Sequence, residues 1–174
     1  MSTMSLLCLI LAGGKSTRMG DDKALLFDSV NTLIGILNSR DCRVIVACGG
    51  EERSGLFHGE CWFDPADSTS LGEVVHAFVQ QYDEEIQLFP CDMYNLDREA
   101  IEAILRQSPG VPIDMNGLDQ YTLARIPQGF NFPNSKSLKH LFSQLDRNQM
   151  DWLGRRIENF NSPNQIEHQN KSNQ

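Results

Sequence analysis

The sequence predicts an α/β protein, with helices on both faces of a mostly parallel sheet in three α/β/α layers. Two observations support this fold class. Short apolar runs typical of buried strands alternate with segments whose apolar residues recur at helical spacing. The first three apolar runs each end at glycine or at aspartate and proline, which interrupt strands. The 174 residues can bury about two thirds of the unfolded surface in one core, so no metal or disulfide is needed for folding.

The first part of the chain predicts the start of a parallel sheet. Residues 6–11 and 43–48 are apolar runs of the buried type, and residues 31–39 between them have helical spacing. Because two parallel strands need a crossover connection, this order of strand, helix and strand favours parallel pairing. A third short apolar run, residues 61–63, ends at Asp64.

Capping signals predict where the next two helices begin. Ser70 and Glu73 have the spacing of a capping box, which predicts a helix over residues 71–81. Residues 85–90 form another apolar strand, and Asp97 then caps the following helix. These elements continue the alternation of strands and helices.

The signals weaken after residue 109, where the sequence predicts short elements around an Asn116-Gly117 turn. They are strands over residues 111–115 and 121–126, a helix over residues 135–145, a strand over residues 156–160 and a closing helix that begins at Ser162. We expect one domain over residues 1–167 and a polar tail over residues 168–174.

The composition argues against several classes of function. A net charge of -8 disfavours nucleic acid and anionic membranes as partners, because both attract basic surfaces. The five cysteines include no Cys-x-x-Cys pair, which favours reduced thiols in a cytoplasmic protein. No apolar run approaches membrane-spanning length, and no basic segment of a secretion signal precedes the first run.

The loop after the first strand has the properties of a phosphate-binding loop. Ala12, Gly13 and Gly14 have little or no side chain, so the backbone can approach a ligand and expose consecutive N–H groups to an anion. Three cations follow within nine residues, namely Lys15, Arg18 and Lys23. In an acidic chain this local positive charge favours a polyphosphate ligand, although a glycine turn with solvated charges would have the same composition.

Two well-known phosphate-binding motifs do not match this loop. A P-loop needs glycine five positions before Gly14, where the chain has Leu9. A dinucleotide-binding fingerprint needs its second glycine at the position of Lys15. The loop therefore belongs to neither class.

Residues 11–26 closely resemble the N-terminal signature of the MobA-like nucleotidyltransferases, above all in the Arg-Met-Gly-x-Asp-Lys spacing that ends at Lys23. That family is typified by molybdenum cofactor guanylyltransferase, which joins GMP to molybdopterin. The resemblance implies a Rossmann-like sheet of the nucleotide-diphospho-sugar transferase type. It also implies GTP or another nucleoside triphosphate as donor, a molybdopterin-type phosphate acceptor and Mg²⁺ as cofactor.

Two further segments resemble the same family. Residues 89–93 are similar to a strand-end segment whose aspartate, here Asp92, holds magnesium. A carboxylate at this place is chemically suitable, because Mg²⁺ binds through one or two carboxylates while water and phosphate oxygens complete the octahedron; a solvated aspartate at a strand end is the alternative. Asn159 and Asn161 match asparagines near the metal and phosphates, and Asp64 matches an aspartate near the nucleotide.

The expected chemistry is attack of a substrate phosphate on the α-phosphate of the donor. Because this brings two anions together, the protein must position and neutralise them. We expect backbone N–H groups of residues 12–15 to hold polyphosphate. The predicted catalytic residues are Arg18, Lys23 and Asp92, with Asp92 as the metal ligand. The predicted nucleotide-binding residues are Leu11, Ala12, Gly13, Gly14, Lys15, Lys23, Asp64, Asn159 and Asn161.

The chain departs from the family pattern in loops that would receive the acceptor. Residues 28–33 lack the usual Gly-Lys and Pro, and residues 120–124 lack the usual proline. Two alternatives to GMP transfer therefore stay open: a divergent member that binds nucleotide or a partner protein without efficient catalysis, or a transferase for another base or acceptor, such as CTP and molybdopterin. We expect a monomer or a weak homo-oligomer.

Overall fold

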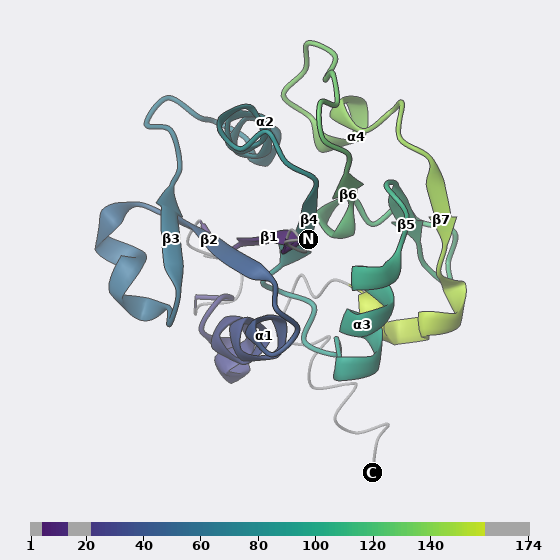
Figure 1. The fold of residues 1–174 in the computed structure, drawn as a ribbon, viewed down its shortest axis with the longest axis horizontal. Coiled ribbons are helices and arrows are strands. Elements are labelled where there is room, and N and C mark those ends of the chain that lie inside the picture. The colour runs from purple at the N-terminus through teal and green to yellow at the C-terminus, as the bar shows by residue number, and fades with distance from the viewer. Residues whose placement is uncertain (1–4, 14–21, 159–174) are drawn as a thin grey trace.

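The computed structural model describes residues 5–13 and 22–158, and its centre is a five-stranded sheet with the order β3-β2-β1-β4-β6 (Figure 1). The strands are β1 (Leu7–Leu11), β2 (Arg43–Gly49), β3 (Glu60–Phe63), β4 (Ile86–Pro90) and β6 (Arg125–Ile126). Strands β1 to β4 are parallel, and only β6 at the edge is antiparallel. The predicted mostly parallel α/β fold is confirmed.

Helices cover both faces of this sheet. Helices α1 (Ser29–Asn38) and α3 (Arg98–Arg106) pack on one face, and α2 (Leu71–Gln81) and the short α4 (Leu138–Leu141) lie over the other, as Figure 1 shows. Short 3₁₀ segments complete the path: η1 (Leu26–Asp28), η2 (Glu51–Leu56), η3 (Tyr121–Leu123) and η4 (Asp151–Ile157). The three layers agree with the predicted architecture.

Strand β1 is the centre of the sheet and is buried on both faces. Leu7 lies opposite Arg43 of β2 and Ile86 of β4, so β1 is paired on both edges. Leu9 packs into the core beneath α2, and Ile10 packs into the core beneath α1. A continuous apolar run is the pattern expected of such a strand, because neither face meets water.

The capping hydrogen bonds that the sequence predicts at the starts of α2 and α3 are present in the structure. Ser70 Oγ accepts a hydrogen bond from the Glu73 N–H at 3.2 Å, and Glu73 Oε2 accepts one from the Ser70 N–H at 3.1 Å. The helix over residues 71–81 is thereby confirmed with both of its boundaries. Asp97 Oδ1 accepts from the Ala100 N–H at 2.8 Å and begins α3.

The structure corrects the predicted strands after residue 109. Residues 111–115 pair only over β5 (Val111–Ile113), which forms a separate two-stranded sheet with β7 (Arg147–Gln149). The sequence does not predict β7, because its residues are polar. Residues 121–126 are not one strand, since η3 occupies their first half.

The predicted helix over residues 135–145 and the strand over residues 156–160 are also wrong where the structure describes them. Only the four residues of α4 are helical in the first segment. The second begins inside η4, a 3₁₀ segment that continues to Ile157, so its first two residues are helical rather than extended. Residues 159–160 and the helix predicted after Ser162 lie outside the described residues.

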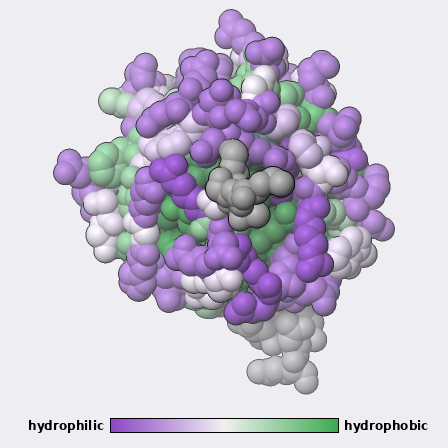
Figure 2. Space-filling view, viewed as in Figure 1, coloured by the Kyte–Doolittle hydropathy of each residue, from purple (hydrophilic) through white to green (hydrophobic). Residues whose placement is uncertain are grey.

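None of the helices in the described part of the chain is long and apolar enough to cross a membrane. Figure 2 shows one face of the molecule, on which hydrophilic side chains surround smaller areas of apolar residues.

Replacement of glycine by alanine is expected to change the stability of the fold in opposite directions at two helical positions, Gly72 and Gly35. A Cβ at Gly72, in the first turn of α2, would overlap the backbone carbonyl of Lys136, whereas a Cβ at the exposed Gly35 of α1 would meet nothing within 4 Å. We expect Gly72→Ala to destabilise the fold by about 1–3 kcal/mol, because the backbone must shift. Gly35→Ala should stabilise it by about 0.5–1 kcal/mol. Urea unfolding of both variants tests this, and equal effects would contradict it.

Candidate active site

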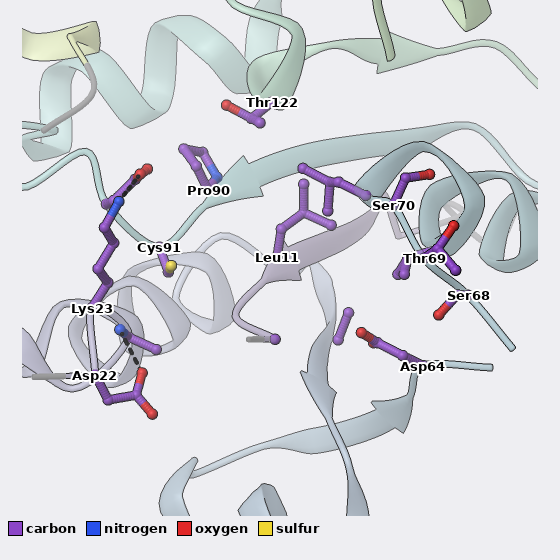
Figure 3. Close-up of a pocket in the computed structure, with 16 residues that line it drawn as sticks. Leu11, Asp22, Lys23, Asp64, Ser68, Thr69, Ser70, Pro90, Cys91 and Thr122 are labelled. Atoms are coloured by element: carbon purple, nitrogen blue, oxygen red, sulfur yellow. Dashed lines mark hydrogen bonds and ion pairs between the residues drawn. The ribbon is translucent and has the colours of Figure 1, made fainter. Parts of the chain in front are cut away.

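A cavity of about 590 Å³ lies at the carboxyl ends of the parallel strands. Apolar side chains of β1, β2, β4 and α2 form part of its wall, and polar side chains from the following loops surround them (Figure 3). The carboxyl edge is where open α/β sheets bind ligands, because loops from several strands meet there. The lining residues are Leu11, Gly13, Asp22, Lys23, Ala24, Ala47, Asp64, Ser68, Thr69, Ser70, Leu71, Val74, Pro90, Cys91, Asp92 and Thr122.

A lysine and an aspartate form an ion pair in the wall of the cavity. Lys23 Nζ lies 3.5 Å from Asp92 Oδ2, and the two side chains are 19% and 20% exposed. Asp92 follows the end of β4, and the Tyr94 hydroxyl donates to the backbone carbonyl of Lys23 at 3.0 Å. Burial raises the pKa of the Asp92 carboxyl group, and the nearby Lys23 opposes this shift. The sequence predicted both side chains for one site, and the structure brings them together.

Asp64 lines the same cavity from the end of β3. Its Oδ1 atom is buried and has no hydrogen-bond partner among the described residues. Burial raises the pKa of this carboxyl group, against the opposing effects of the Gly49 N–H and of Arg53. A Cβ on Gly13 would lie 3.0 Å from Asp64 Oδ2 and 3.1 Å from the Gly49 nitrogen. The absence of a side chain at Gly13 therefore lets the loop after β1 lie close to Asp64 and Gly49 without displacing them.

The shifted pKa of Asp64 predicts a pH dependence of stability. Because the pKa is raised on folding, the folded protein binds this proton more tightly than the unfolded chain does. The resulting stabilisation is complete below the ordinary aspartate pKa of about 3.9 and is lost as the pH rises through the raised value. We expect the unfolding free energy of the wild type, relative to Asp64→Asn, to fall over this range in urea unfolding experiments. A difference that does not change with pH would contradict the shift.

A buried arginine that the sequence did not reveal joins the segments of the site. Arg53 of η2 is 6% exposed. Its Nε donates to the Cys48 carbonyl at 2.7 Å, and its Nη2 donates to the Ala12 carbonyl at 2.7 Å and to Asp22 Oδ1 at 3.2 Å. Arg53 therefore fixes the end of β2, the end of β1 and the segment just before Lys23. Its neighbours Glu51 and Glu52 are exposed, so the local sequence is typical of a surface.

The structure describes part of the predicted nucleotide-binding set. Leu11, Gly13 and Asp64 line the cavity with Lys23 and Asp92. The Ala12 N–H donates to the Ala47 carbonyl at 2.9 Å, so this amide extends the sheet instead of facing the predicted phosphate. Gly14, Lys15, Arg18, Asn159 and Asn161 lie outside the described residues, and their roles remain predictions.

The chemistry of Asp92 fits a magnesium ion shared with phosphate. The part of the chain that the structure describes holds no group of three or more His, Cys, Asp or Glu side chains placed to bind a metal. Mg²⁺ can be held by one or two carboxylates, however, when phosphate oxygens and water supply its other ligands. The raised pKa of Asp92 indicates a carboxylate that has lost solvation, which a bound cation would compensate.

Comparison with known proteins identifies the family. A model described as the MobA-like NTP transferase domain matches residues 8–124. The chain belongs to this family. The matched residues include β1 from Cys8 onward, β2 to β4 and all the cavity residues described above. The MobA-like family is a family of nucleotidyltransferases. No curated protein matches the chain in sequence.

Solved structures support the same fold for this MobA-like chain. A protein from Aquifex aeolicus VF5 has a TM-score of 0.69 at 15% identity, with coverage of 90% of this chain and 93% of that one. Molybdopterin-guanine dinucleotide biosynthesis protein A from Archaeoglobus fulgidus has a TM-score of 0.59 at 14% identity, covering 97% and 100%. The 4-diphosphocytidyl-2C-methyl-D-erythritol synthase from Anaerococcus prevotii has a TM-score of 0.55 at 10% identity, covering 97% of each chain. At these identities the likeness concerns the fold alone.

Proposed function

We propose that this protein is a Mg²⁺-dependent nucleotidyltransferase that transfers GMP from GTP to molybdopterin and releases pyrophosphate. The observation that carries the proposal is the Lys23–Asp92 pair in the wall of a cavity that also holds Gly13 and Asp64. Membership of the MobA-like family supports this reading of the cavity. We place the reaction in the cytoplasm, as the cysteine content predicts.

The residues of the cavity suit a reaction between two phosphates. The acceptor phosphate and the α-phosphate are both anionic, so catalysis depends on positioning and on positive charge. Lys23 supplies a cation in the cavity wall, and Asp92 would hold Mg²⁺. When bound, this ion would neutralise charge on the phosphate oxygens. Gly13 and Asp64 line the part of the cavity where the donor would bind, and the predicted contributions of Arg18 and Lys15 would add further positive charge.

CTP is the second candidate donor. The fold is shared with a molybdopterin-guanine dinucleotide biosynthesis protein and with a diphosphocytidyl-methylerythritol synthase, so the fold itself does not select the base. The changed acceptor loops favour the further alternative of nucleotide binding without turnover. Both alternatives are outcomes of the same assay.

Pyrophosphate release from each of the four nucleoside triphosphates, with Mg²⁺ and molybdopterin, tests the proposal. We expect release with GTP alone and its loss in Lys23→Ala, because that variant removes the cation beside Asp92. Lys139→Ala is the matched control, since Lys139 is exposed on α4 and does not line the cavity. Release with CTP alone would identify the other donor. Measurable nucleotide binding without release from any triphosphate would refute the transferase proposal.

A further inference from the structure

Tyr94 joins the segment that carries Asp92 to the segment that carries Lys23. Its hydroxyl donates a hydrogen bond to the Lys23 backbone carbonyl at 3.0 Å. Its ring meets the ring of Phe27 edge to face, with centroids 5.3 Å apart. Tyr94 follows Asp92 closely in the chain, yet it does not line the cavity that holds the Lys23–Asp92 pair. One side chain outside the cavity therefore contacts the lysine segment at Lys23 and again at Phe27.

Further contacts hold the same two segments together. Ser29 Oγ, at the start of α1, donates to the carbonyl of Cys91, the residue before Asp92, at 3.2 Å. Phe27 has a φ of 56°, a left-handed conformation that is unfavourable for a residue with a large side chain and persists where its surroundings hold it. The ring of Tyr94 is one of these surroundings. The segment after Lys23 is therefore fixed against the end of β4.

The segment before Lys23 is fixed by a different contact. Arg53 Nη2 donates to Asp22 Oδ1 at 3.2 Å, and the same oxygen accepts from the Ala24 N–H at 3.1 Å. Ala24 is buried in the core. Both neighbours of Lys23 are thus anchored, and the Tyr94 hydroxyl holds the carbonyl of Lys23 itself. Figure 3 shows the Lys23 side chain extending from this backbone to its ion pair.

A fixed backbone is important for Lys23 because its ammonium group ends a flexible four-carbon stem. The distance of 3.5 Å between Lys23 Nζ and Asp92 Oδ2 is longer than the roughly 2.7–2.9 Å of a strong charge-assisted hydrogen bond. The ion pair alone therefore does not define where the ammonium group lies. Since a misplacement of about 1 Å can lower a catalytic rate about 100-fold, the origin of the lysine side chain must be held by other groups.

We infer that Tyr94 is a positioning residue that sets the location of the Lys23 ammonium group relative to Asp92. The inference rests on the proposed function, in which Lys23 supplies positive charge to the reacting phosphates and Asp92 would hold Mg²⁺. Tyr94 acts through the Lys23 carbonyl and is not a catalytic residue itself. Loss of its hydroxyl changes how the two catalytic side chains are held without removing either of them.

Steady-state kinetics of Tyr94→Phe test this role, because the variant keeps the ring beside Phe27 and removes only the hydroxyl. We expect kcat for pyrophosphate release to fall about tenfold while the KM values for GTP and molybdopterin stay unchanged, since the hydroxyl binds neither substrate. Tyr82→Phe is the matched control, because Tyr82 follows α2 and does not line the cavity. An unchanged kcat in Tyr94→Phe, or a rise confined to either KM, would overturn the inference.

Chemical labelling of Lys23 tests the same geometry without substrate or metal. Acetic anhydride acetylates lysine amino groups, and mass spectrometry gives the rate at each lysine, with the exposed Lys139 of α4 as internal reference. In Tyr94→Phe we expect the rate at Lys23 relative to Lys139 to rise about fivefold, the factor by which loss of a hydrogen bond of about 1 kcal/mol raises the population of the released segment. Tyr82→Phe should keep the wild-type ratio. A purely stabilising role of Tyr94 would lower the midpoint of thermal unfolding and leave the ratio unchanged, which would contradict the inference.

The two measurements separate this inference from the proposed function. If the wild type releases no pyrophosphate from any nucleoside triphosphate, the transferase proposal fails, and the labelling ratio still decides whether Tyr94 holds Lys23 in place. If the wild type is active and Tyr94→Phe matches it in both kcat and labelling ratio, the transferase proposal stands and the role of Tyr94 is refuted.

Discussion

Asp92→Asn is expected to lower kcat/KM for pyrophosphate release by about 100-fold or more. The amide keeps the volume of the side chain but removes the negative charge that would hold Mg²⁺ and that pairs with Lys23 at 3.5 Å. The apparent Mg²⁺ concentration for half-maximal rate should rise in the same variant. Steady-state pyrophosphate release as a function of Mg²⁺ measures both quantities.

The loss in Asp92→Asn should not come from unfolding. Burial raises the pKa of Asp92, so the ionised group is desolvated in the folded protein, and a neutral side chain removes that cost. We expect the unfolding free energy at neutral pH to stay close to that of the wild type. Asp83→Asn is the matched control, because Asp83 is exposed and lies outside the cavity. Full activity of Asp92→Asn would show that this carboxylate does not serve the reaction.

The elements that the sequence predicted well carry their signals locally. Residues 6–11 are apolar throughout because β1 is buried on both faces, and the Ser70–Glu73 pair fixes the start of α2 by hydrogen bonds within four residues. Such features follow from the neighbouring residues alone. The same holds for the family resemblance of residues 11–26, which the match over residues 8–124 confirms.

The later elements depend on contacts that the local sequence does not contain. Helix α4 ends at Leu141, and the carbonyls of Phe142 and Leu145 after it accept hydrogen bonds from Arg147 Nη1 at 3.2 and 2.8 Å. This arginine belongs to β7, whose polar residues form a strand only because β5 lies beside them. Apolar spacing therefore predicted a longer helix than the chain forms.

The site was predictable where single residues follow strands and unpredictable where packing places them. Lys23, Asp64 and Asp92 come directly from strand ends and from the loop motif, and they line one cavity. Thr122 lies there because the buried amides of Gln87 and Gln107 hold the next carbonyl. Gln87 and Gln107 lie 36 and 16 residues from Leu123 in the sequence, so no local sequence pattern reveals these hydrogen bonds.

Arg53→Met is expected to lower the unfolding free energy by about 3–5 kcal/mol, the usual cost of breaking a buried ion pair from one side. Methionine fills much of the volume but leaves the Ala12 and Cys48 carbonyls without their donors at 2.7 Å and leaves Asp22 without its guanidinium. For a domain of this size the midpoint of thermal unfolding should fall by roughly 10 °C. Urea and thermal unfolding measure the two quantities.

A double variant separates the lost charge pair from the lost backbone contacts of Arg53. Adding Asp22→Asn removes the uncompensated carboxylate, so the double variant should be less destabilised than the sum of the two single changes. Arg106→Met is the control: Arg106 is 79% exposed and lies 3.9 Å from Glu102, and such surface pairs contribute at most about 0.5 kcal/mol. If Arg53→Met cost no more than Arg106→Met, the ends of β1 and β2 and the segment before Lys23 would have to be held without Arg53. Strict additivity with Asp22→Asn would show instead that the backbone contacts, and not the ion pair, give Arg53 its effect.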